Sequence, residues 1–136
     1  MSPAMHLKIV GCMLLALACC LVVFPRYFQW KQELARLSLI NRQIFLVHVG
    51  FIILLLILLG VLNVVFTEAL LDGTQLAAVV NAGIAIFWGV RLLTQWLVYS
   101  PKHWIGKPLH TGIHLGWSAA LAYFVIVHLW AMRTAI

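Results

Sequence analysis

Four long apolar stretches separate the polar segments of the chain. They lie at residues 7–24, 44–66, 76–99 and 109–130, and the second contains the run FIILLLILLGVL. A hydrocarbon core about 30 Å thick needs roughly 20 apolar residues in a helix. Pro108 stands just before the fourth stretch, and proline in the first turn of a helix loses no hydrogen bond. The pattern therefore predicts four transmembrane helices.

Polar side chains inside three of these stretches recur at helical spacing. Within an arc of about 80°, the fourth helix carries His110, His114, Trp117, Leu121, Phe124 and His128. The third helix carries a similar stripe of Asn81, Trp88, Arg91, Gln95 and Tyr99, and the second carries Asn41, His48 and Asn63. Because polar groups in hydrocarbon need partners, we expect these stripes to face one another inside a four-helix bundle.

The composition supports an integral membrane protein. Of 136 residues, 65% are hydrophobic and only 9% are charged, which is far too apolar for a soluble domain of this size. The length is that of one small bundle, and the chain shows no linker or repeat, so we expect a single transmembrane domain over residues 1–136. The fold class is all-α, the bilayer is its expected partner, and the expected location is the bacterial inner (plasma) membrane.

Basic residues are distributed unevenly over the connections. Residues 25–43 contain four lysines and arginines, and residues 100–108 contain Lys102 and Lys107. The only charged residues in the second connection, residues 67–75, are the acidic Glu68 and Asp72. Since cytoplasmic loops carry the excess of lysine and arginine, the first and third connections are predicted to be cytoplasmic and both termini extracytoplasmic. This asymmetry accounts for the net charge of +6, so we expect no nucleic-acid partner.

The start of the chain has an alternative interpretation. Lys8, the apolar run and ALA at 16–18 resemble a cleavable signal peptide. The apolar run continues through CCLVVF beyond that site, which favours a retained helix. Cleavage would leave three helices in the same orientation.

The first connection has an amphipathic pattern. Its apolar residues recur at helical spacing: Tyr27, Trp30, Leu34, Leu37 and Ile44. Such a pattern is typical of a helix lying in the membrane interface. An ordinary anchoring turn of aromatic and basic residues is the alternative.

Several polar residues are predicted to lie at one depth in the cytoplasmic half of the membrane. His48 and His114 are each about five residues from the cytoplasmic end of their helices, and the third helix places Arg91 and Gln95 in the same half. The predicted pocket is lined by His48, Arg91, Gln95, His114, Trp88 and Trp117. A second group in the outer half comprises Asn63, Asn81 and His128.

A b-type haem is one candidate ligand, with His48 and His114 as axial ligands of the iron and Arg91 near a propionate. Gly112 and Gly116 would let a flat ligand or another helix approach closely.

Other occupants of the predicted site remain open. A quinone or a lipid could place an anionic group at Arg91, because no carboxylate lies in any of the four stretches. His110 and His114 could bind a metal ion together with His103. In the simplest alternative, the histidines and Gln95 only hydrogen-bond between helices while Arg91 extends to the membrane surface.

These features leave three function classes. The first is a ligand-binding or accessory subunit of a membrane redox or lipid system, with partner subunits or further copies of this chain. The second is an enzyme acting on a lipid, isoprenoid or quinone, with His48 or His114 as acid or base. The third is an oligomeric transporter. The lack of carboxylates within the stretches excludes a di-iron carboxylate site.

Overall fold

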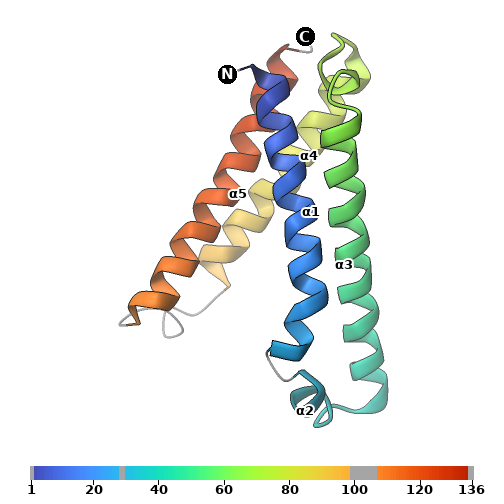
Figure 1. The fold of residues 1–136 in the computed structure, drawn as a ribbon, viewed down its shortest axis with the longest axis vertical. Helices are drawn as coiled ribbons and strands as arrows, with labels where there is room; N and C mark the ends of the chain where they lie inside the picture. Colours follow the sequence, from blue (N-terminus) through green and yellow to red (C-terminus); the bar gives the residue numbers. More distant parts are fainter. Residues whose placement is uncertain (1, 28–29, 99–106, 135–136) are drawn as a thin grey trace. The chain divides into compact units, whose positions relative to one another are not determined.

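The computed structural model describes residues 2–27, 30–98 and 107–134, and these residues are helical apart from short turns. The elements are α1 (Pro3–Tyr27), α2 (Trp30–Leu34), α3 (Leu39–Val65), η1 (Ala69–Leu71), α4 (Gln75–Leu97) and α5 (Pro108–Thr134) (Figure 1). In this part of the chain α1, α3, α4 and α5 are long and apolar enough to cross a membrane. The prediction of four apolar membrane-spanning helices is therefore confirmed at the level of length and composition.

Capping residues explain where two of the helices begin. The Ser38 side chain accepts a hydrogen bond from the Asn41 backbone N–H, so α3 begins at Leu39, five residues before the predicted start. The Thr74 hydroxyl caps α4 in the same way by accepting from the Ala77 N–H at 3.1 Å. Because Ser38 starts a new helix, the end of the predicted amphipathic segment belongs to α3, and the separate helix within that segment, α2, comprises five residues.

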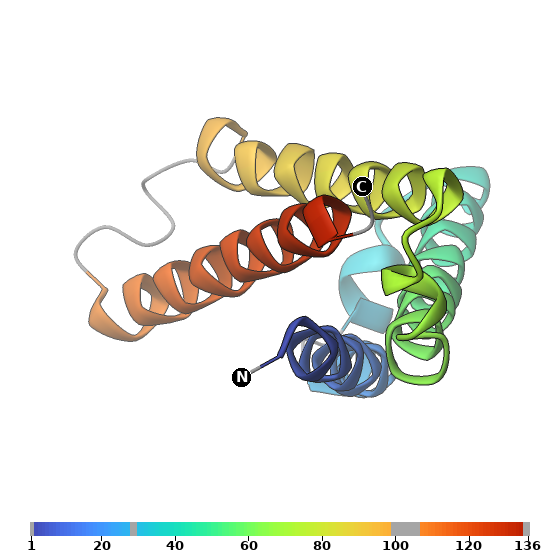
Figure 2. The same cartoon turned by 90° about the horizontal axis from the view of Figure 1, so that it is seen from above.

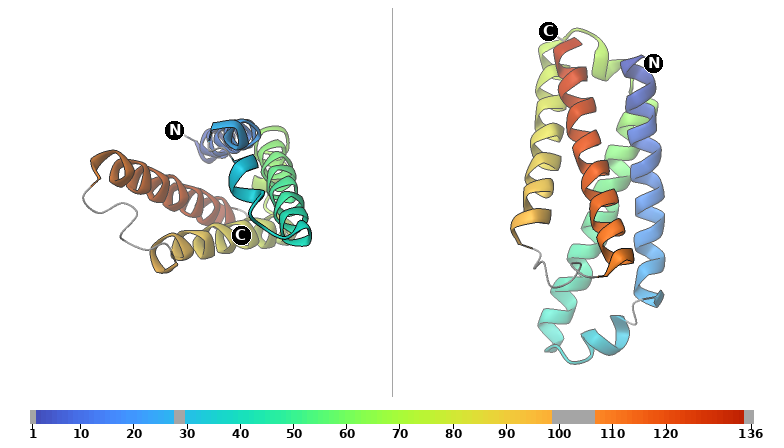
Figure 3. Two further views of the ribbon diagram at one scale, coloured as in Figure 1. Left: turned by 90° about the horizontal axis from the view of Figure 1, so that it is seen from below. Right: turned by 90° about the vertical axis from the view of Figure 1, so that its left-hand side faces the viewer.

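Contacts divide the chain into two units. Unit 1 comprises residues 1–7 and 68–136, and unit 2 comprises residues 8–67. In unit 1, α4 and α5 lie side by side and η1 contacts both of them (Figure 2). In unit 2, α1 and α3 lie side by side (Figure 3). The single domain and the four-helix bundle stay predictions.

The core of unit 1 lies between α4 and α5. Buried residues on α4 are Ala77, Ala78, Asn81, Ile84, Ala85, Trp88 and Gln95. Those on α5 are His114, Ser118, Leu121, Phe124, Val127, His128 and Ala131. In both helices they recur every three or four residues, so the buried members of the predicted stripes lie on one face of each helix. Tyr99 of the predicted third-helix stripe lies outside the described residues. Arg91 and Trp117 at the margins are partly buried, and His110 is exposed.

Two glycines set the packing of unit 2. A Cβ atom on Gly11 would lie 2.8 Å from the Gly60 carbonyl oxygen and 2.6 Å from Val64 Cγ2. A Cβ atom on Gly60 would lie 2.7 Å from Leu15 Cγ. Only glycine permits this approach of α1 to α3, as in many membrane helix pairs. Gly112 and Gly116, which the sequence also suggested as a close-approach pair, have no neighbouring atom within 4 Å of such a Cβ among the described residues.

We expect Gly11→Ala to lower the free energy of unfolding by about 1–3 kcal/mol, because the added methyl group meets a backbone oxygen that cannot rotate away. Gly50→Ala is the matched control on α3, since a Cβ there meets nothing within 4 Å. It should change stability by no more than about 1 kcal/mol. Titration with dodecyl sulfate, followed by circular dichroism, measures both. Equal effects of the two substitutions would contradict close packing at Gly11.

Candidate functional site

Arg91, Gln95 and His114 form a connected polar cluster in unit 1. Arg91 and Gln95 lie one turn apart on α4, and Gln95 faces α5. Arg91 Nη1 donates to Gln95 Oε1 at 3.2 Å, and Gln95 Nε2 lies 2.9 Å from His114 Nδ1. Gln95 and His114 are buried, whereas Arg91 is partly buried. The structure therefore brings together three of the predicted pocket residues.

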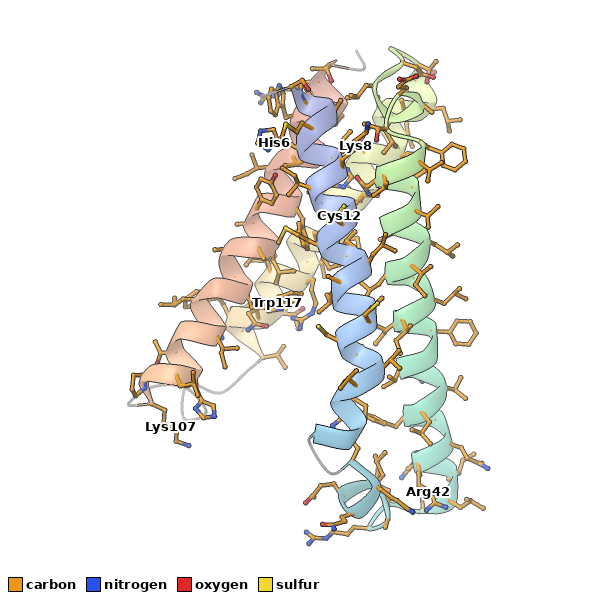
Figure 4. The ribbon with its side chains drawn as sticks, viewed as in Figure 1. His6, Lys8, Cys12, Arg42, Lys107 and Trp117 are labelled. Atoms are coloured by element: carbon orange, nitrogen blue, oxygen red, sulfur yellow. The ribbon has the colours of Figure 1, made fainter. Side chains whose placement is uncertain are left out.

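Three tryptophans on α4 and α5 differ in their contacts. The Trp96 ring meets His114 edge-on, with centroids 4.9 Å apart and an interplanar angle of 74°. Trp88 is buried and packs edge-on against Phe124 at 5.1 Å, so it belongs to the α4–α5 core. Trp117 lies on α5 and is partly buried (Figure 4). Among the predicted aromatic lining residues, Trp88 is thus the one that fills the helix interface.

A second polar group connects η1, α4 and α5. Asn81 Nδ2 donates to the carbonyl oxygens of Leu70 at 2.8 Å and Ala77 at 2.9 Å, and Asn81 Oδ1 lies 2.9 Å from His128 Nδ1. Asn81 and His128 are completely buried. The sequence grouped Asn63 with these two residues, but Asn63 belongs to unit 2, where its Nδ2 donates to Leu59 O at 2.9 Å.

His6 forms a contact that the sequence pattern did not suggest. Its Nδ1 lies 2.8 Å from the Tyr123 hydroxyl, and its ring centroid lies 5.6 Å from that of Trp130. Figure 4 labels His6 near the start of α1. The first turn of α1 thereby attaches to α5 within unit 1. His6 precedes the first predicted apolar stretch, so no periodic stripe pointed to it.

The other predicted ligands of an iron or metal ion include His48 and His103. His48 on α3 is exposed and belongs to unit 2, and its Nδ1 lies 2.8 Å from the Ile44 carbonyl oxygen of the same helix. Its pairing with His114 as a haem ligand stays a prediction. His103 lies outside the described residues. Within the described part of the chain, no three His, Cys, Asp or Glu side chains are grouped in a way that would hold a metal ion.

No protein-family model, no curated protein and no solved structure matches this chain. Its functional interpretation therefore depends on the chemistry of the residues described above.

We expect Asn81→Leu to destabilise the protein by about 1–3 kcal/mol, because it leaves the buried His128 Nδ1–H and the Leu70 carbonyl without this partner. Asn41→Leu on the exposed start of α3 is the control and should change stability by less than about 0.5 kcal/mol. The dodecyl sulfate titration compares them. A cost for Asn81→Leu no larger than the control's would show that the amide contributes no net stability.

Proposed function

We propose that this protein is a small multi-pass membrane protein that binds a lipophilic molecule at Arg91, Gln95 and His114. It would act as a ligand-binding or accessory subunit of a membrane redox or lipid system. The observation that carries the proposal is the hydrogen-bonded connection from Arg91 through Gln95 to His114, between two long and mostly apolar helices. Candidate ligands are a quinone, a lipid and a b-type haem.

The energetic cost of this cluster supports a functional role. An arginine in the middle of a membrane helix costs about 2.5–3.5 kcal/mol on insertion scales, and buried glutamine and histidine must be hydrogen-bonded. A single bond between polar side chains in a membrane protein returns only about 1 kcal/mol. Ionisable residues inside membranes are therefore usually kept for binding or transport.

The contacts at the ends of the chain support an orientation in which both termini lie on the same, extracytoplasmic side. His6 near the N-terminus contacts Trp130 near the C-terminus. Lys107 stands just before the start of α5, at the other end of that helix from Trp130, and Lys31 and Arg36 follow the end of α1 in the chain. In the first connection, the edge-on contact of Trp30 with Phe45 at 5.2 Å is consistent with an aromatic anchor in the cytoplasmic interface. The bacterial inner membrane is the proposed location.

We expect a lipophilic ligand to co-purify with the protein in mild detergent and to be retained in native mass spectrometry. Arg91→Gln should lower its occupancy by about tenfold, because a charge-assisted hydrogen bond to the ligand is lost. Arg133→Gln is the matched control, since Arg133 is exposed at the far end of α5. Equal retention by both variants, or no bound molecule in the wild-type protein, would refute the proposed site.

An absorption spectrum of the same sample tests haem as the ligand. Reduced-minus-oxidised bands that disappear in both His48→Ala and His114→Ala would identify it as the occupant. A colourless protein with a retained quinone or lipid would assign the site to one of those molecules.

The orientation is tested by labelling single cysteines with a membrane-impermeant maleimide. The background replaces Cys12, Cys19 and Cys20 by serine, because all three are exposed free thiols. We expect Asp72→Cys to be labelled on intact cells and Arg36→Cys to be labelled only after permeabilisation. The reverse pattern would invert the proposed topology.

A further inference from the structure

Arg91 determines the orientation of the Gln95 side-chain amide. A guanidinium group has five N–H donors and no acceptor, so the Gln95 atom that faces Arg91 at 3.2 Å must be the carbonyl oxygen. The amide nitrogen then faces His114 Nδ1 at 2.9 Å. Turning the amide over would place its N–H groups against those of Arg91. The positive charge on α4 therefore makes Gln95 a hydrogen-bond donor toward α5.

The orientation of Gln95 in turn selects the tautomer of His114. Gln95 Nε2 donates, so His114 Nδ1 must accept and carries no hydrogen. A neutral imidazole holds its one hydrogen on the other ring nitrogen. His114 therefore carries its N–H at Nε2. Ligation of a haem iron through Nε2 requires the opposite tautomer, in which Nδ1–H donates to an acceptor and Nε2 presents a lone pair.

His128 provides the contrasting case on the same buried face of α5. Asn81 directs its Nδ2 at two backbone carbonyls, which places Oδ1 toward His128 Nδ1 at 2.9 Å. Because Oδ1 only accepts, His128 Nδ1 must carry the hydrogen. The two histidines have opposite tautomers, although they share one helix face. Helical position alone does not distinguish them, but their α4 partners do.

We propose that His114 is a hydrogen-bond donor to the ligand, and that the site takes a molecule whose head group presents an accepting oxygen. This inference rests on the proposed function, since it assumes that a ligand binds beside Arg91, Gln95 and His114. The shared chemistry is that of a quinone carbonyl or of an anionic lipid oxygen. His114 is then not an iron ligand, and Nε2 is not a base.

The groups around His114 support an acceptor ligand. Both polar atoms of Gln95 are engaged, the oxygen with Arg91 and the nitrogen with His114. The Ser118 hydroxyl donates to the His114 backbone oxygen at 2.8 Å and so points its hydrogen along α5. The charged member of the cluster, Arg91, has donors only. With the Nε2–H of His114, this combination is complementary to an oxygen atom.

The tautomer is measured directly by nitrogen-15 NMR of histidine-labelled protein in detergent, which distinguishes protonated from unprotonated ring nitrogens. The His114 and His128 signals are assigned by their loss in His114→Gln and His128→Gln. We expect Nε2–H for His114 and Nδ1–H for His128. An Nδ1–H tautomer at His114 in the wild-type protein overturns the proposal, whether or not any variant folds.

Gln95→Glu tests the consequence for binding. A carboxylate at this position keeps a similar volume and still accepts from Arg91, but it also accepts from His114 Nδ1. It thereby moves the His114 hydrogen to Nδ1 and leaves a lone pair at Nε2. Gln75→Glu is the control, because it makes the same change at the exposed start of α4. Circular dichroism and melting temperature establish that both variants are folded.

Two probes separate the sources of the accepting oxygen. Decylubiquinone added to protein in neutral detergent should quench tryptophan fluorescence if the ligand is a quinone. Vesicles of phosphatidylcholine with or without phosphatidylglycerol should show selective retention of the anionic lipid if it is a lipid head group. For whichever probe binds, we expect Gln95→Glu to weaken affinity by about tenfold or more and Gln75→Glu to leave it unchanged.

Undiminished binding by a folded Gln95→Glu variant overturns the donor role of His114 while leaving the proposed binding function intact. If neither probe binds to the wild-type protein, the proposed ligand class fails, and the co-purification experiment decides the binding function separately. The NMR measurement still decides the tautomer in that case, so the two failures are distinguishable.

Discussion

The requirement that polar groups buried in an apolar environment find partners organises unit 1. Among the described residues, α4 and α5 are joined by the hydrogen bond that Gln95 donates to His114 and by the one that His128 donates to Asn81. The partners are 14 residues apart on each helix, which is close to four full turns. Both bonds therefore lie on the same face and in the same antiparallel register. Trp88 and Phe124 pack edge-on against each other between these two hydrogen bonds. The polar pairs therefore specify the register between α4 and α5, and apolar packing stabilises it.

The described residues of unit 2 pack closely through glycines and apolar side chains of α1 and α3. Gly11 and Gly60 allow α1 and α3 to approach closely, and van der Waals contact supplies the attraction that the hydrophobic effect does not provide in lipid. Most of α3 presents large apolar side chains on its surface, as suits a helix surrounded by acyl chains. Its polar side chains mainly bond to their own helix, as His48 and Asn63 do.

The polar cluster of Arg91, Gln95 and His114 has both an energetic cost and a chemical consequence. An arginine is costly to place within a membrane helix, and through Gln95 Arg91 determines which nitrogen of His114 carries the hydrogen. Gln95 connects Arg91 to His114 because its side-chain amide accepts a hydrogen bond at the oxygen and donates one from the nitrogen. The charge of Arg91 on α4 thus selects the tautomer of His114 on α5. His128 has the opposite tautomer, because its partner Asn81 donates to backbone carbonyls and presents its oxygen to the ring.

Sequence periodicity alone determined the four apolar helices and the inward faces of α4 and α5, because spacing along a helix sets both the angle and the depth of each side chain. It also grouped Arg91, Gln95 and His114, which hydrogen bonds connect in the structure, and their role as a ligand site stays a prediction. Only the tertiary structure decided that Gln95 bonds to His114 and that His6 contacts Tyr123, since these pairs depend on the register between helices. It likewise placed the start of α3 at Leu39, where a serine hydroxyl caps the helix before the apolar pattern begins. The direction of each hydrogen bond depends on the partner residue on the adjacent helix. The pattern within one helix therefore does not predict which nitrogen of each histidine carries the hydrogen.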